Sequence, residues 1–429
     1  MKSIVFHIDV NSAYLSWSVA EQLKSGAKID IRTVPAIIGG DQQSRHGVVL
    51  AKSIPARKYG IRTGEPVANA FSKCPNLLSV SPDHKLYHEK SKLLMNYLKS
   101  FTPDIEQVSV DECYMDYTGI AHRFASPVEG ATIIKDGVRE KFGFTVNIGI
   151  STAKVLAKMA SDFEKPDKVH TLFPEEIPEK MWPLPMEELF MAGHASVETL
   201  KKLEIKTIGD LAKADPKLIE LHLKSHGRML WEFANGIDHN MVQTKRAEAK
   251  GIGNSTTLSD DLTTFEEVQE VLLRLAESVG GRLRKAGQKA NMVSVEIKYY
   301  DFQTSSHQRQ LTRPADADVI LYQEACGLFE ELWTGEPVRL LGIRTSKLVD
   351  AMTPVQMSLF DLIQSNPEEK SAVHVKNSGN FNTDCEEQED EKHKKVNEAL
   401  DAIRKRYGAD AVMRATLMEK KHGKDKKEL

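Results

Sequence analysis

Three carboxylates in this sequence stand where strand-like segments end or turn. Asp9 ends the first strand-like run, and Asp111 with Glu112 lies within the segment Ser109 to Asp116. Mg²⁺ is commonly held by a few carboxylates together with substrate phosphates. Two such ions about 3.5–4 Å apart stabilise the attacking and the leaving oxygen of an in-line phosphoryl displacement. The carboxylates therefore predict metal-assisted phosphoryl transfer, provided that their strands are neighbours.

Cationic side chains complete this set. Lys154 and Lys158 lie one helical turn apart, and Arg57 with Lys58 follows Ile54 to Ala56. An adjacent Asp-Glu pair alone is more often a solvated surface feature. Its combination with phosphate-binding cations is typical of a nucleotidyl transferase.

Two glycine pairs, Gly39-Gly40 and Gly280-Gly281, invite a reading as nucleotide loops. Neither belongs to a G-x-x-x-x-G-K-[ST] or G-x-G-x-x-G pattern after a strand. We expect Gly280-Gly281 to cap the end of a helix, where glycine is common.

Apolar periodicity predicts the elements that must position these residues. Strands are expected at 1–10, 33–38, 47–50, 105–115 (strand, turn, strand) and 144–150, and helices at 11–26, 84–101, 127–142 and 153–161. This alternation indicates an α/β or α+β unit through about residue 165. The following segments are expected to be all-helical to about 240, a basic linker at 241–251, a βαββαβ unit at 252–349, disordered from 364 to about 391, and helical at 394–407.

The composition excludes several classes of protein. A chain of 429 residues holds two to four domains, and 41% hydrophobic with 28% charged residues is ordinary for a soluble globular protein. No apolar run approaches the roughly 18 residues that span a bilayer. The start lacks the pattern of a signal peptide, and four cysteines without CxxC spacing argue against a zinc site or disulfide framework. We expect a cytoplasmic protein without a membrane partner.

Charge is uneven although the net charge is only −3. Residues 245–347 carry 14 Lys/Arg and 15 Asp/Glu, and two helix-like segments there, 264–281 and 316–333, hold nine of the acids and one of the bases. The strand-like remainder has a balance of +7. It predicts a sheet with one basic face that binds a nucleic-acid backbone, although solvated helix faces explain the charges equally well.

The motifs and their order resemble the Y-family translesion DNA polymerases, most closely the bacterial members, from residue 4 to about 361. His7 to Tyr14 resembles the first catalytic motif of the family, and Ser109 to Asp116 resembles the second. Arg57 falls on the triphosphate-binding arginine and Lys158 on the triphosphate-binding lysine. Val338 to Lys347 is similar to the last strand of the little-finger domain.

The resemblance implies an α+β multidomain fold, a right-hand polymerase. Its expected parts are a ferredoxin-like palm (1–10 and 78–166), small fingers (11–77), a helical thumb with a helix-hairpin-helix (167–240), a linker (241–251), a βαββαβ little finger (252–349), and a clamp-binding, partly disordered tail with a C-terminal helix (350–429).

The resemblance also implies roles for individual residues. Asp9, Asp111, Glu112 and the Val10 carbonyl are expected to bind two Mg²⁺ ions, with the three carboxylates catalytic. Tyr14 is expected to act as the steric gate beneath the incoming sugar, and the alternative is a helix-face core residue. Two positions depart from the family pattern. Ala13 stands where an aromatic residue is common, and Ile54 replaces a tyrosine that donates to the triphosphate, so that triphosphate binding depends more on Arg57 and Lys158.

Contacts to primer-template DNA are expected in the second half of the chain. The thumb hairpin contributes Gly193, and its usual first glycine is Met191. The linker and little finger contribute candidate backbone contacts at Lys250, Ser255, Thr256, Arg282, Arg284, Lys289, Arg309 and Arg344. Gln356-Met357-Ser358-Leu359-Phe360 resembles the pentapeptide that docks bacterial polymerases on the sliding clamp, with Gln356, Leu359 and Phe360 as anchors; the alternative is a tail segment folded on the little finger.

The expected function is error-prone, template-directed translesion DNA synthesis from dNTPs, without proofreading, by a monomer. Two other classes remain for comparison. A nucleotide cyclase uses a similar palm but has no need of a thumb, a basic linker or a clamp peptide. A catalytically inactive DNA-binding accessory protein would keep those parts and lose the carboxylates.

Overall fold

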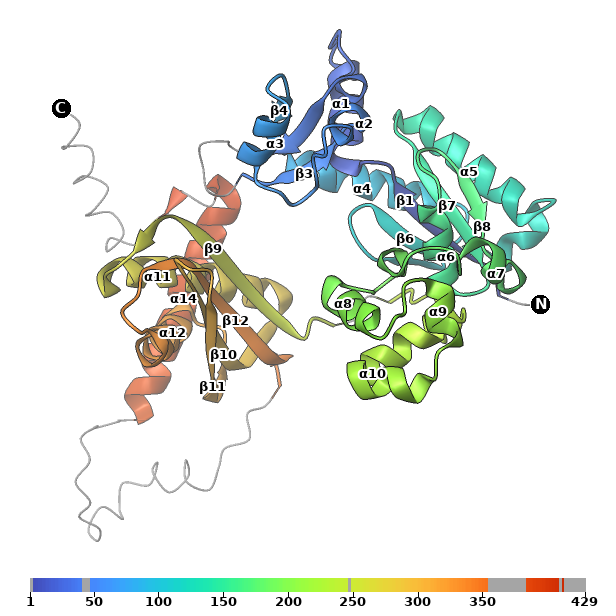
Figure 1. Ribbon diagram of the computed structural model, residues 1–429. Helices are drawn as coiled ribbons and strands as arrows, with labels where there is room; N and C mark the ends of the chain where they lie inside the picture. Colours follow the sequence, from blue (N-terminus) through green and yellow to red (C-terminus); the bar gives the residue numbers. More distant parts are fainter. Residues whose placement is uncertain (1–2, 41–46, 246–247, 354–382, 409–410, 413–429) are drawn as a thin grey trace. The chain divides into compact units, whose positions relative to one another are not determined.

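The structure is a computed structural model that describes residues 3–40, 47–245, 248–353, 383–408 and 411–412, with side chains described from 395 onward in the last helix (Figure 1). The chain forms two compact units, Met1–Ala247 and Glu248–Leu429. No described helix is long and apolar enough to cross a membrane.

A five-stranded sheet forms the centre of the first unit, in the order β5-β6-β1-β7-β8. Its strands are β1 (Val5–Val10), β5 (Ile105–Gln107), β6 (Glu112–Asp116), β7 (Val146–Ser151) and β8 (Val169–Thr171). The central strand β1 is buried along its whole length and pairs antiparallel with both β6 and β7. The two strands that carry the predicted carboxylates are therefore neighbours.

Helices cover this sheet because each has one apolar face. The largest core cluster joins the sheet to α1 (Ala13–Lys24), α4 (His84–Lys99) and α5 (Pro127–Phe142). Helix α6 (Lys154–Asp162) packs closely on β7, where a Cβ on Gly149 would overlap the carbonyl oxygen of Ala157. Only glycine fits at this position.

A smaller three-stranded sheet, β3-β2-β4, lies in the expected fingers region. Its strands are β2 (Ala36–Gly39), β3 (Val49–Lys52) and β4 (Leu78–Val80), accompanied by η1 (Ile31–Thr33), α2 (Ile54–Arg57) and α3 (Val67–Lys73). Strands β2 and β3, near the expected positions 33–38 and 47–50, pair antiparallel. Strand β4 pairs in parallel with β2, so that this sheet extends to residue 80, beyond the expected boundary at 77.

The remaining described helices of the first unit differ in length. They are η2 (Thr118–Arg123), before α5, and then η3 (Pro174–Glu176), α7 (Ile177–Lys180), η4 (Met186–Glu188), α8 (His194–Lys202), α9 (Ile208–Lys213) and α10 (Pro216–Ala234). The expectation of an all-helical run directly after residue 166 is wrong at its start, because β8 adds an edge strand parallel to β7. Three residues are too few for a periodic pattern to reveal the strand.

The second unit contains the predicted βαββαβ order. Its elements are β9 (Gly251–Leu262), α11 (Phe265–Ala286), β10 (Gln288–Tyr299), β11 (Thr304–Ala315), α12 (Asp318–Leu332) and β12 (Val338–Asp350). The strands form an antiparallel sheet in the order β11-β10-β12-β9. One face packs against α11 and α12 in a single apolar core, and no described helix of this unit covers the other face, the open face (Figure 1).

Two expectations for helix ends in this unit are wrong. Gly280 and Gly281 lie inside α11, and the helix is capped instead by Gly287, whose φ of 65° is left-handed. Gly280 is needed for packing, because a Cβ there would overlap Oδ1 of Asp318. The last helix, α14 (Thr383–Tyr407), begins before the expected residue 394, within the segment predicted to be disordered.

Candidate active site

Strand register brings the three predicted carboxylates to one end of the central sheet. Asp9 and Glu112 are directly opposite each other in the β1–β6 pair, and the N–H of Val10 donates to the carbonyl of Asp111 at 3.1 Å. The hydroxyl of Ser109 donates to Oδ1 of Asp111 at 2.6 Å and accepts the backbone N–H of Glu112 at 3.0 Å. The turn before β6 therefore orients Asp111 beside Glu112.

Two lysines face these carboxylates. Nζ of Lys165 donates to Oδ2 of Asp9 and lies 2.8 Å from Oδ1 of Asp162. Nζ of Lys158 lies 3.2 Å from Oε1 of Glu112 and 3.4 Å from Oδ2 of Asp162. Lys165 was not predicted, because its position depends on a chain reversal after α6 that no local pattern encodes.

Lys154, one helical turn from Lys158, pairs with a different carboxylate. Its Nζ lies 2.7 Å from Oε2 of Glu106 on β5 and 4.7 Å from the centre of the Tyr114 ring. Because its partner Glu106 is not one of the three site carboxylates, we do not include Lys154 among the phosphate-binding candidates.

Burial makes the site sensitive to nearby charge. Asp9 is only 6% exposed, and burial raises the pKa of its carboxyl while Lys165 acts against that effect. The pKa of Glu112 is lowered to about 2, first by His7, whose Nε2 lies 3.7 Å from Oε2, and also by Lys158. Burial lowers the pKa of His7 itself. Glu112 is therefore an anion at neutral pH.

The donor set suits a hard divalent cation, because it consists of carboxylate oxygens that already hold positive charge between them. Among the described residues, no group of three or more His, Cys, Asp or Glu is gathered closely enough to hold a metal ion. Asp9 and Glu112 face Lys165 and Lys158 instead. The carboxylates fit a divalent cation by residue type and by strand register, and in this structure the two lysines occupy their oxygens.

Tyr14 lies beside this acidic end of the sheet. It is the second residue of α1, and its ring stacks on Tyr87 with centroids 4.4 Å apart and an angle of 12°. Burial, and next the charge of Asp111, raises the pKa of Tyr14. The neighbouring Ala13 is buried, so that Tyr14 provides the aromatic surface at this position.

The cations of the fingers region lie on β3 and α2. Arg57 is exposed at the end of α2, whereas Ile54 is 59% exposed and has no hydrogen-bonding side chain. Burial, and next the charge of Arg57, lowers the pKa of Lys52. Lys52 is a second candidate cation that was not predicted, because its side chain alternates with buried Val49 and Ala51 as in any half-buried strand.

The expected thumb hairpin has the backbone geometry of a glycine-containing turn. Met191 adopts a φ of 69°, in the left-handed region that favours glycine. Gly193 precedes α8 as its N-cap, and no side chain caps this helix. The N–H groups of the first turn therefore point to a position where a phosphate is favourable.

Register sorts the predicted contacts of the second unit between two faces. Arg344 is exposed and pairs with Gly253, and Ser255 pairs with Gly342, all on the open face. Thr256 instead pairs with buried Leu341 and therefore lies on the helix-covered face.

Arg309 and Arg284 also belong to the helix-covered side. Arg309 pairs with buried Val293 in the sheet, and its guanidinium contacts Glu324 at 3.0 Å and also Glu331. Arg284 lies within α11 and donates to Asp318 at 2.8 Å and to Asp401 at 2.7 Å. Thr256, Arg309 and Arg284 are therefore withdrawn as DNA contacts.

Two further predicted DNA contacts, Arg282 and Lys250, lie outside the strands of the sheet. Arg282 also lies in α11 and donates to the carbonyl of Gly253. Lys250 is exposed just before β9. The basic character expected of the sheet is thus smaller than the sequence balance suggested, because several of the counted cations lie on helices or face them.

The clamp peptide residues Gln356, Leu359 and Phe360 lie outside the described residues.

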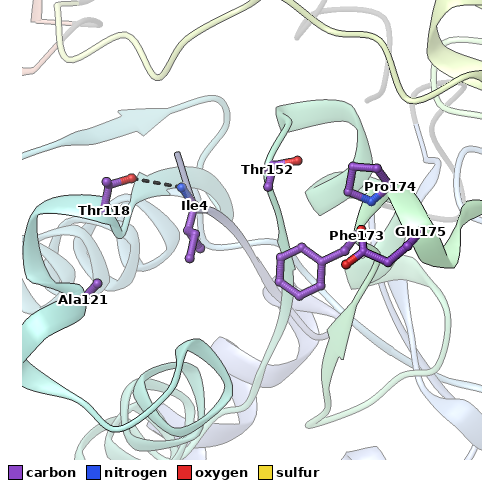
Figure 2. Close-up of a pocket in the computed structure, with 7 residues that line it drawn as sticks. All are labelled: Ile4, Thr118, Ala121, Thr152, Phe173, Pro174 and Glu175. Carbon is purple, nitrogen blue, oxygen red and sulfur yellow. Dashed lines mark hydrogen bonds between the residues drawn. The ribbon is translucent and has the colours of Figure 1, made fainter. Parts of the chain in front are cut away.

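A cavity of about 280 Å³ lies elsewhere in the first unit (Figure 2). Its lining residues are Ile4, Thr118, Ala121, Thr152, Phe173, Pro174 and Glu175. Ile4 precedes β1, whereas Asp9 lies near its other end, roughly 16 Å away at about 3.3 Å per residue. This mainly apolar cavity is therefore separate from the acidic site.

Comparison with known proteins identifies the fold and then the family. A solved Y-family DNA polymerase chimera, Dbh-Dpo4(243-245)-Dbh, matches with a TM-score of 0.70 at 22% identity, over 81% of this chain and 99% of that chain. The fold is therefore that of the Y-family polymerases. Residues 8–162 match the impB/mucB/samB family, and residues 249–359 match the C-terminal domain of that family.

Curated relatives match over nearly the whole chain. DNA polymerase IV of Clostridium acetobutylicum is 47% identical over 422 residues, which are 98% of this chain and 99% of that protein. DNA polymerase IV 1 of Bacillus subtilis is 33% identical over 425 residues, 99% of this chain and 95% of that protein. The chain belongs to the impB/mucB/samB family, and the resemblance drawn from its motifs is confirmed.

Proposed function

We propose that this protein is a DNA-directed DNA polymerase that extends a primer on a template and carries out error-prone translesion synthesis without proofreading. The observation that carries this proposal is the strand register that sets Asp9 opposite Glu112, with Asp111 beside them. The DNA polymerase IV relatives support the same activity. The substrates are primer-template DNA and dNTPs.

Asp9, Asp111, Glu112 and the carbonyl of Val10 would hold two Mg²⁺ ions. The ions would supply Lewis-acid stabilisation of the oxygens that attack and leave during nucleotidyl transfer. The chain's own contribution is to fix the ligands: β1 and β6 set the spacing of Asp9 and Glu112, and Ser109 orients Asp111. Because the pKa of Glu112 is lowered to about 2, its carboxylate is ionised at neutral pH.

Cations around the carboxylates would bind the triphosphate. Arg57 and Lys158 are the residues expected from the sequence, and the structure adds Lys52 and Lys165 as candidates. Lys165 neutralises Asp9 and Asp162. With Asp9 acting as a metal ligand, the Lys165 ammonium group would be available to bind phosphate oxygens.

We expect Lys165→Ala to raise the KM for dNTP by at least about tenfold, because a hydrogen bond to a charged group contributes roughly 1.5–3 kcal/mol. Steady-state single-nucleotide incorporation measures the effect. Lys168→Ala is the matched control, since Lys168 lies in the same segment and its side chain pairs with the exposed Glu164 at 3.5 Å rather than with a site carboxylate. A KM for Lys165→Ala within twofold of wild type would remove Lys165 from the triphosphate site.

DNA would be held by surfaces that bind the backbone without reading sequence. The N-terminus of α8 at Gly193 would bind one phosphate, and Lys250, Ser255 and Arg344 would contact others from the second unit. Binding through phosphates suits an enzyme that must accept any template. We expect a cytoplasmic monomer.

The segment Gln356 to Phe360 would dock on the sliding clamp. Changing Leu359 and Phe360 to Ala is expected to leave synthesis on a short primer unchanged and to abolish stimulation by the clamp, because two buried apolar anchors contribute roughly 1.5–3 kcal/mol each. Primer extension with and without clamp measures this. Truncation after Asp361 is the companion variant and should keep the stimulation. If truncation abolishes it while the double alanine variant retains it, the contact lies in residues 362–429 instead.

The remaining alternative is a catalytically inactive DNA-binding accessory protein. The presence of Asp9, Asp111 and Glu112 in one site argues against it. Primer extension with Mg²⁺ tests the proposed function directly, because an accessory protein would bind the primer-template and leave its length unchanged.

A further inference from the structure

A fully buried asparagine lies next to the carboxylate site. Asn147 is 0% exposed on β7 and is directly opposite Asp9 in the β1–β7 pair. Its side-chain amide donates to the carbonyl of Ser161 at 3.0 Å and to the carbonyl of Glu164 at 2.7 Å. Its Oδ1 accepts the backbone N–H of Lys168 at 3.2 Å. None of the predicted roles uses this residue.

These three bonds enclose the segment that carries Lys165. Ser161 lies in the last turn of α6, Glu164 precedes Lys165, and Lys168 stands immediately before β8. The amide of Asn147 thus holds the start, the middle and the end of the chain reversal between α6 and β8. The same reversal directs the Lys165 ammonium group to Asp9.

A second anchor holds the outer side of this segment. Asp167 contacts Nζ of Lys135 at 3.1 Å and Nη1 of Arg139 at 2.6 Å, both on α5. Asp167 is partly exposed, whereas Asn147 is inside the sheet. Asn147 therefore anchors the segment on its inner side, together with the backbone N–H of Ile148, which donates to the carbonyl of Lys168 at 3.0 Å.

The chemistry requires a carboxamide. Asn supplies two donors and an acceptor at one position, whereas Ser has a single donor and Asp has none when ionised. An Asp at this position would leave the carbonyls of Ser161 and Glu164 without their donor. It would also add a further negative charge to the group formed by Asp9, Asp111 and Glu112.

We propose that Asn147 is a positioning residue for nucleotidyl transfer: it holds the α6–β8 segment so that Lys165 reaches Asp9 and the triphosphate. The inference rests on the proposed function and assigns a specific task to a side chain that touches neither substrate nor metal. Asn147 acts through Lys165, and the two substitutions should therefore not be additive.

The kinetic test is a double-mutant cycle on the full chain. Asn147→Ala is expected to raise the KM for dNTP at least about fivefold while kcat changes less than about twofold, the signature of lost uniform binding. In a Lys165→Ala background, the same change should raise KM less than about twofold. Ser151→Ala is the matched control, because Ser151 is equally buried on β7 and also bonds a backbone carbonyl, but lies opposite Val5. If the double variant raises KM by the product of the two single effects, the proposal is overturned.

A readout independent of catalysis separates this inference from the proposed function. Asn147→Ala is expected to speed hydrogen–deuterium exchange of residues 163–168 at least about tenfold, and Ser151→Ala is not. If Asn147→Ala does not fold, Asn147→Ser replaces it, with a smaller increase expected in both readouts. Unchanged exchange in a folded variant would overturn the proposal.

A wild-type protein that fails to extend primers would contradict the proposed function. The exchange experiment would still decide whether Asn147 holds the segment.

Discussion

Asp111→Ala or Glu112→Ala is expected to reduce primer extension in Mg²⁺ to below a few per cent of wild type while binding of primer-template DNA survives. Each substitution removes a proposed oxygen ligand from the site at the β1–β6 pair, and a two-metal site stabilises both the attacking and the leaving oxygen. The proposed DNA contacts lie on other elements, at α8 and in the second unit. Extension of a labelled primer and DNA binding by anisotropy measure the two effects separately.

Asp116→Asn is the matched control for the carboxylates. Asp116 lies on the same strand as Glu112 but is opposite Val5 at the far end of β1, where its carboxylate accepts the N–H of Thr118 at 2.8 Å. We expect it to keep most of the activity. Robust extension by either active-site variant, or equal loss in the control, would contradict the assignment of the metal ligands.

Tyr14→Ala is expected to increase ribonucleotide incorporation relative to dNTP incorporation by at least about tenfold. The Tyr14 ring is fixed by stacking on Tyr87 and lies close to Asp111, so that it can form the floor beneath the sugar of a nucleotide bound there. A clash with a 2′-hydroxyl that costs more than about 1.4 kcal/mol corresponds to one decade in discrimination. The measurement is the ratio of incorporation efficiencies for dCTP and CTP.

Tyr14→Phe distinguishes the ring from the hydroxyl. Because the aromatic ring provides the steric contact, the phenylalanine variant should discriminate against CTP as well as the wild type does. An unchanged ratio in Tyr14→Ala would mean that another residue excludes the 2′-hydroxyl, and a relaxed ratio in Tyr14→Phe would mean that the hydroxyl makes the distinction.

The longer helices and strands could be predicted from the sequence. Helix α5 was placed at its observed bounds, and the βαββαβ order of the second unit was anticipated because each segment is long enough to show its period. Strand β8 was missed because three residues show no period. The end of α11 was predicted at Gly280-Gly281 because glycine is common at helix ends. Gly280 instead lies inside the helix, where it makes room for Asp318.

The carboxylates of the candidate site could be predicted, because their residue type suggests metal binding and neighbouring strands bring them together. Asp9 and Glu112 are recognisable by residue type and are brought together by neighbouring strands. Lys165 was not predictable, because its contact with Asp9 depends on a chain reversal held by Asn147. Arg309 illustrates the opposite error: its charge suggested DNA, but strand alternation turns it to α12.

Templated incorporation of single nucleotides tests the central claim most directly. On four primed templates that differ only in the first unpaired base, the wild-type protein with Mg²⁺ should add chiefly the complementary dNTP, lengthen the primer by one nucleotide and release one pyrophosphate for each addition. Chelation of the divalent cation should abolish the reaction. Incorporation that ignores the template, cyclisation of the nucleotide without primer growth, or DNA binding without any extension would contradict the account.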